Sequence, residues 1–122
     1  MPNSTGLIYN SPTSGNVATQ ILVTCLNDSL NIPANIEIEV FKWDTTQTAR
    51  IPVGHDLFQV IPQASRTLIY ALTNAAFYEV QSDYFSATST IIHVYGVDST
   101  GGIIQRVLQS EMILVDRFTN IT

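Results

Sequence analysis

Short apolar stretches separated by turn residues occupy most of this chain, from Val17 onward. Ile, Val, Thr, Tyr and Phe dominate these stretches, and such side chains suit the pleated surface of a strand. No window sustains apolar residues at the i, i+3, i+4, i+7 spacing of an amphipathic helix, so we expect almost no helix. The pattern predicts eight strands, at about residues 17–26, 35–43, 48–53, 56–61, 66–72, 75–82, 88–97 and 103–116.

Turn-forming residues separate these stretches. Residues 54–56 (Gly-His-Asp) predict a turn between the third and fourth strands, and residues 98–102 predict a hairpin with glycines where φ must be positive. Many short strands at this spacing are typical of a sandwich or barrel, and eight of them suit a jelly roll. We therefore predict an all-β fold, an eight-stranded jelly-roll-like antiparallel β-sandwich formed by residues 17–122.

Residues 1–16 differ from the rest, because they are polar, rich in Gly and Pro, and carry one apolar triplet, Leu7-Ile8-Tyr9. Sixteen extended residues reach on the order of 50 Å, more than the width of a small domain. We predict an extended N-terminal arm or connector whose triplet adds a strand to an exposed sheet edge of a neighbouring copy. Such a contact is head-to-tail and gives a ring if it closes or a filament if it does not. A disordered tail is the alternative.

Alternation along the strand 35–43 distinguishes its two faces. The even positions from 36 to 40 are aliphatic and predict a core face. The odd positions carry two carboxylates and then Phe41 and Trp43, which is unusual for a solvated face. These aromatic residues either cover the open end of the sandwich or contact a partner subunit or a sugar ring.

Two later strands are also apolar on both faces. In a lone two-sheet sandwich each strand has one solvated face, so two apolar faces indicate that something covers the outside. No helix is predicted that could do so, and we infer that the cover is another copy of the chain. The candidate interface residues are Phe41, Trp43, Ile91, Tyr95, Met112 and Leu114.

Composition narrows the classes of binding partner that we expect for this chain. The 122 residues fit one domain, and 45% of them are apolar, but only 12% are charged, about half the usual fraction. The net charge of −5, with five Lys and Arg in total, argues against nucleic acid and against an anionic membrane surface. No apolar run approaches the ~20 residues of a membrane-spanning helix, so we expect no membrane insertion. The first residues show no secretory signal, and a surface location would then follow from assembly or cell lysis.

No catalytic constellation is visible, so we predict that the chain is not an enzyme and uses no cofactor and no metal. His55 falls in the predicted turn, His93 reads as a packed strand residue, and no Gly-x-Ser-x-Gly nucleophile motif occurs. Glu37 and Glu39 share one face, which we interpret as solvated. Cys25, the sole cysteine, sits in an apolar run and predicts a buried free thiol.

Four sequence blocks together resemble small spore-surface proteins of spore-forming Firmicutes, related to endospore-appendage (Ena-type) pilus subunits. The blocks are 39–44 (EVFKWD), 77–81 (FYEVQ), 94–98 (VYGVD) and 105–111 (QRVLQSE), within a similarity that covers residues 17–117. The resemblance implies a jelly-roll fibre subunit that joins its neighbours through an N-terminal connector and is released by lysis of the mother cell. Residues 1–16 lack the connector cysteines of the better-known appendage subunits, which implies a non-covalent connector contact.

These observations favour a structural subunit that self-assembles into an extracellular or spore-surface filament through sheet contacts and arm exchange. Its partners are then copies of itself, with spore-surface anchoring or tip proteins as further candidates. One alternative is a carbohydrate- or protein-binding sandwich with an aromatic platform, and another is a viral or phage jelly-roll structural protein. The platform would combine Phe41, Trp43, Tyr84 and Phe85 with Asp44 and Arg50.

Overall fold

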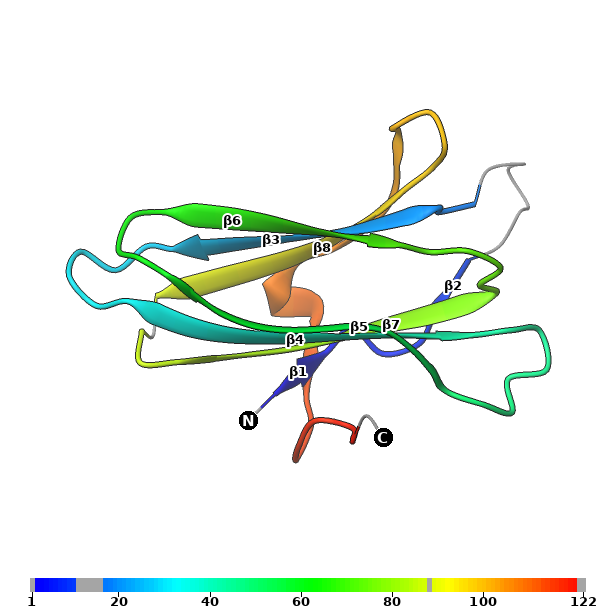
Figure 1. Ribbon diagram of the computed structural model, residues 1–122, viewed down its shortest axis with the longest axis horizontal. Coiled ribbons are helices and arrows are strands. Elements are labelled where there is room, and N and C mark those ends of the chain that lie inside the picture. The colour runs from blue at the N-terminus through cyan, green and yellow to red at the C-terminus, as the bar shows by residue number, and fades with distance from the viewer. Residues whose placement is uncertain (1, 11–16, 88, 121–122) are drawn as a thin grey trace.

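The computed structural model describes residues 2–10, 17–87 and 89–120, and over these ranges the chain is an all-β sandwich of two antiparallel sheets (Figure 1). The six-stranded sheet has the order β10 (Ile113–Leu114), β1 (Asn3–Ser4), β7 (Phe77–Phe85), β4 (Ala34–Trp43), β5 (Ile51–Val60), with β2 (Ile8–Tyr9) also on β7. The four-stranded sheet has the order β6 (Ser65–Ala71), β3 (Gln20–Asn27), β8 (Thr90–Val97), β9 (Ile103–Val107). The predicted β-sandwich is confirmed, and its jelly-roll connectivity stays a prediction.

The core lies between the sheets and follows the period of two expected for strands. Along β3, residues Ile21, Val23 and Cys25 are fully buried while their neighbours are partly exposed. They face the inward residues of β4 and β7, including the large ring of Tyr78. Cys25 is the buried free thiol that was predicted, and burial raises its pKa to about 12.

The prediction of two strands at 48–53 and 56–61 is wrong, because β5 runs unbroken through the expected turn. Gly54 serves a packing role in the strand instead of a turn. The Tyr70 ring lies so close to this backbone that a Cβ on Gly54 would be 2.5 Å from Tyr70 Cε1. A register shift opposite Val40 and Phe41 accommodates one extra residue of β5 at this point, as in a β-bulge.

The last predicted strand, 103–116, is also divided. β9 ends at Val107, and a 3-10 turn, η2 (Gln109–Glu111), follows before β10 begins. Glu111 Oε1 accepts the Leu108 amide proton at 2.8 Å and stabilises this turn. The chain therefore crosses from the four-stranded to the six-stranded sheet here. The predicted 98–102 hairpin is confirmed, with Gly101 at φ +88°.

The N-terminal arm lies on its own chain. β1 and β2 both pair with β7, with Ser4 opposite Gln81 and Ile8 opposite Tyr78. Leu7 lies between the two short strands and is 52% exposed. Residues 11–16 of the predicted arm lie outside the described residues. The arm thus occupies a sheet edge of the kind predicted, within one copy.

Replacing Gly54 with Ala tests the close approach of Tyr70. The added methyl group forces the ring or the strand to move, and we expect a loss of about 1–3 kcal/mol in the free energy of unfolding. Urea unfolding measures this. Gly102→Ala is the control, because its Cβ would meet only the Asp98 carboxylate at 3.4 Å and its φ is not positive. Wild-type stability of Gly54→Ala would contradict the packing described.

Candidate functional site

Polar and charged side chains gather on the outer face of the six-stranded sheet, and several of them are buried there. Glu39, Glu79 and Gln81 point away from the sandwich core, yet none is more than 7% exposed. Part of the cover comes from the chain itself, because the C-terminal segment 117–120 lies on the outer side of this sheet, where Thr119 is hydrogen-bonded to Gln81 and Arg50 (Figure 1). The N-terminal strand β1 and the C-terminal segment 117–120 are each held by side chains of β7.

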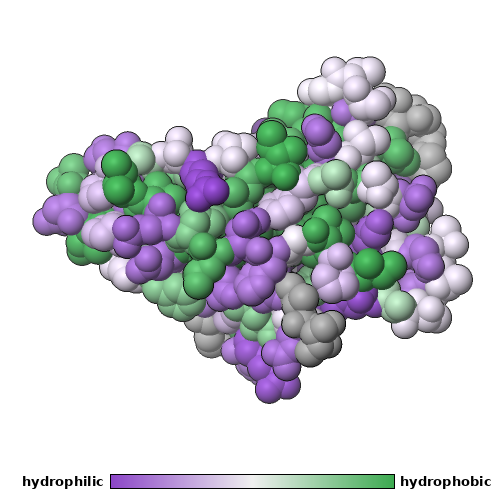
Figure 2. Space-filling model, viewed as in Figure 1, coloured by the Kyte–Doolittle hydropathy of each residue, from purple (hydrophilic) through white to green (hydrophobic). Residues whose placement is uncertain are grey.

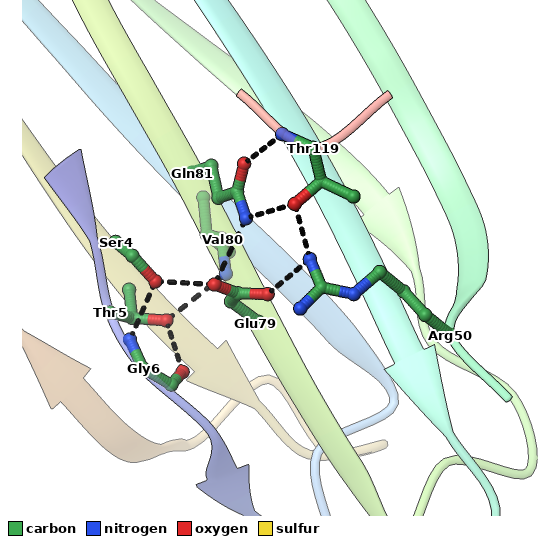
Figure 3. Close-up of polar contacts among 8 residues, drawn as sticks. All are labelled: Ser4, Thr5, Gly6, Arg50, Glu79, Val80, Gln81 and Thr119. Carbon is green, nitrogen blue, oxygen red and sulfur yellow. Dashed lines mark hydrogen bonds and ion pairs between the residues drawn. The ribbon is translucent and has the colours of Figure 1, made fainter. Parts of the chain in front are cut away.

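Glu79 is the centre of the contacts to the N-terminal strand (Figure 3). Ser4 Oγ donates to Glu79 Oε2 at 2.5 Å, and Gln81 Nε2 donates to the same oxygen at 3.1 Å. The Arg50 Nη1 atom lies 3.1 Å from the other carboxylate oxygen. Because these contacts join β1, β7 and the residue that precedes β5, they fix β1 against β7 beyond its few backbone hydrogen bonds.

Thr119 makes the corresponding contacts that hold the C-terminal segment (Figure 3). Its amide donates to Gln81 Oε1 at 3.0 Å, and its hydroxyl accepts from Gln81 Nε2 at 2.9 Å. Arg50 Nη1 donates to the same hydroxyl at 2.6 Å. Arg50 and Gln81 therefore connect both terminal segments to one polar network.

The aromatic residues of this face contact other side chains of the same chain. The Arg50 guanidinium carbon lies 4.9 Å from the Phe41 ring centroid and 5.0 Å from that of Trp43, a cation–π arrangement. Phe41 is 1% exposed, so it offers no ring to a sugar or a partner here. Tyr84 packs against the core while Phe85 is exposed on the other side of β7, so these two do not form one platform.

Glu37, Glu39 and His55 form a second cluster on the same face. His55 was predicted in a turn, but it lies in β5 directly opposite Glu39, and its Nε2 is 2.7 Å from Glu37 Oε2. One ligand atom from each residue lies within 4.8 Å of the others. The interpretation of both glutamates as solvated is wrong for Glu39, which is 3% exposed. Sequence reasoning missed the cluster because cross-strand register brings it together.

Burial is the main reason that the pKa of the Glu39 carboxyl is raised, and the charges of Glu37 and Glu79 act in the same direction. His55 and Arg50 oppose this shift. Glu39 Oε1 is buried and has no hydrogen-bond partner among the described residues. A buried carboxylate oxygen without a partner is costly, so this position favours a proton or a cation.

The outer face of the four-stranded sheet is different, because apolar side chains stand opposite one another across three strands. Leu22 of β3 pairs with Ile69 of β6 on one side and with Tyr95 of β8 on the other. Ile69 is 62% exposed, and the others are partly exposed. We call this surface the outer apolar row, and it consists of Leu22, Leu26, Ile69, Ile91 and Tyr95.

The predicted interface residues therefore lie on several different surfaces of the domain. Ile91 and Tyr95 lie in the outer apolar row, and Leu114 is 65% exposed in the short strand β10. Met112 packs against the core. Tyr9 of the arm stacks on Phe77 with ring centroids 5.0 Å apart. His93 accepts the Gln109 amide proton at 3.0 Å, as expected for a packed strand residue.

Comparisons with protein-family models, curated proteins and solved structures found no match to this chain. Among the described residues, none of the helical segments has the length and apolar character required to cross a membrane.

Replacing Glu39 with Gln tests the buried carboxyl. A carboxyl whose pKa is raised by folding contributes stability that is fully present below its unfolded pKa and is lost as pH rises through its folded pKa. Glu39→Gln removes this dependence, so we expect it to raise the free energy of unfolding at pH 7 in metal-free buffer and to bring little gain at pH 4.

Urea unfolding at both pH values measures the effect. Asp28→Asn is the matched control, because it removes an exposed carboxyl in the loop that follows β3 of the other sheet and should change little at either pH. Equal destabilisation by Glu39→Gln at pH 7 and pH 4 would contradict the account.

Proposed function

We propose that this chain is a structural subunit, not an enzyme, that assembles with copies of itself into an extracellular or spore-surface filament. The observation that carries the proposal is the outer apolar row. A solvated sheet face normally shows polar side chains, whereas here aliphatic and aromatic residues align across β6, β3 and β8. The C-terminal segment 117–120 covers part of the outer face of the six-stranded sheet, and the outer apolar row has no such cover from it.

A second copy suits this surface for two reasons. Few charges would have to be desolvated, since only 12% of residues are charged. Apolar side chains also reach the surface at several separate places in Figure 2, so further apolar contacts are open to a second copy. Leu22, Ile69 and Tyr95 are neighbours across three strands, and exposed apolar groups of this kind are typical of protein–protein contacts.

The two ends of the sandwich favour a head-to-tail arrangement. Leu30 and Ile61, in neighbouring loops at one end, are 86% and 65% exposed, and Phe85 at the end of β7 is 47% exposed. At the other end of β7, Tyr9 of the arm covers Phe77 and is itself 59% exposed. When one apolar end of a copy meets the other, different end of the next copy, the contact repeats and produces a chain of subunits.

The arm supplies the connection in this proposal. β1 and β2 are two residues each, and their contacts with β7 would be identical if a neighbouring copy provided them. Exchange of an identical element is a low-cost route to assembly. The resemblance to appendage subunits supports the same connector role and is the basis for the spore-surface location and for anchoring or tip partners. The arm has no cysteine, so the contact is non-covalent.

Ile69→Lys tests the outer apolar row. Ile69 is mostly exposed, so the substitution should spare the fold while it places a charge in the proposed contact. We expect light scattering and negative-stain microscopy to show assemblies for the wild type and much smaller species for Ile69→Lys.

Leu57→Lys is the matched control, because Leu57 is 68% exposed on β5 of the other sheet. It should leave assembly intact. A wild type that stays a monodisperse monomer, or equal effects of the two lysine variants, would overturn the proposed role of this surface.

The double variant Ser4→Cys with Gln81→Cys tests arm exchange. The two positions lie directly opposite in the β1–β7 pairing, so a disulfide reports which copy supplies the arm. Exchange predicts a ladder of covalent multimers on a non-reducing gel, and pairing within one copy predicts a single monomer band.

The single variants Ser4→Cys and Gln81→Cys are the controls and should give no ladder beyond a dimer, since Cys25 is buried. If assembled protein yields only the monomer band, the arm exchange is excluded while assembly through the outer apolar row is retained.

A further inference from the structure

We propose that Glu37, Glu39 and His55 form a binding site for a divalent transition metal of the zinc class. The site lies on the outer face of the six-stranded sheet, away from the outer apolar row. It does not depend on the assembly proposed above.

Sheet geometry brings the three ligands together. Glu37 and Glu39 are two residues apart on β4 and therefore share a face, and His55 of β5 stands directly opposite Glu39. One ligand atom from each lies within 4.8 Å of the others. Zinc–ligand bonds of about 2.0–2.2 Å place the ligand atoms about 3–3.5 Å apart, so small side-chain rotations complete the arrangement.

The independent observation is the buried oxygen of Glu39. Glu39 is 3% exposed, and its Oε1 has no hydrogen-bond partner within the described chain. Nearby carboxylates of Glu37 and Glu79 make the surroundings negative, with Arg50 as a partial counter-charge. A bound cation would satisfy the orphan oxygen and neutralise this excess charge.

The site is open to solvent on one side. The three ligands line a cleft of about 400 Å³ together with the C-terminal segment 117–120. The His55 side chain is 46% exposed, so a hydrated ion can reach it. Three protein ligands with a free position for water are the usual composition of an open zinc site. The cationic side chain of Arg117 also lines the cleft and would oppose binding electrostatically.

The ligand set distinguishes among metals. Imidazole nitrogen with carboxylate oxygens suits Zn²⁺, Co²⁺ and Ni²⁺, whereas Ca²⁺ and Mg²⁺ prefer oxygen ligands alone. We therefore expect Zn²⁺ to bind and Mg²⁺ to compete poorly.

The test is Zn²⁺ affinity, measured by competition with a chromogenic chelator on the full chain. We expect His55→Ala and Glu39→Gln each to weaken binding at least tenfold, since even the loss of an outer-shell partner costs about 10- to 100-fold. His93→Ala and Asp28→Asn are the controls, because they remove the other histidine and an exposed carboxylate in the loop after β3 of the other sheet, and we expect no more than about a twofold change. With Co²⁺, the wild type should show visible absorption bands that His55→Ala lacks.

Loss of folding cannot imitate this result, because Glu39→Gln is expected to be at least as stable as the wild type at pH 7 without metal. Carrying out the titration also in the Ile69→Lys background separates the site from assembly. If folded wild-type protein shows no Zn²⁺ binding, or binds it as tightly after His55→Ala, the proposed site does not exist.

Discussion

The alternation of side chains along a strand is the constraint on which this structure depends. A sandwich without long helices has two inner faces that form its core and two outer faces that must be solvated or covered. On the six-stranded sheet the chain covers part of the outer face itself, because Gln81 of β7 holds Thr119 of the C-terminal segment there, while Glu79 holds Ser4 of the neighbouring strand β1. On the four-stranded sheet the outer apolar row has no such cover, and a neighbouring copy is the cover we propose.

The two kinds of cover differ in their physics. Hydrogen bonds and the Arg50 ion pair fix the terminal segments in defined positions, but segments with few buried apolar contacts belong to the least stable part of a protein. The buried residues Ile21 and Val23 lie in β3 of the other sheet, so the exchange that we propose for the arm would leave this part of the core in place. The outer apolar row contributes apolar surface whose burial is favourable but not directional, so it suits packing of many copies more than recognition of one ligand.

Local pattern predicted much of this fold. The alternation in β3 and β8, the buried thiol of Cys25 and the 98–102 hairpin are all properties of short segments, and they were readable from the sequence. The continuity of β5 could not be predicted in this way, because glycine is common in turns. The presence of Gly54 within a strand is explained only by the Tyr70 ring, which comes from another strand. The cluster around Glu39 was hidden for a similar reason, since its members meet through strand register. The place of the arm depends on β7, whose paired residues lie 68 to 79 positions further along the chain.

The central claim is that this domain associates with itself, and sedimentation velocity over a range of protein concentrations tests it most directly. The account predicts species well above the 13.4 kDa of one chain, with a share that grows as concentration rises. A single species at the mass of one chain over the whole range would contradict it.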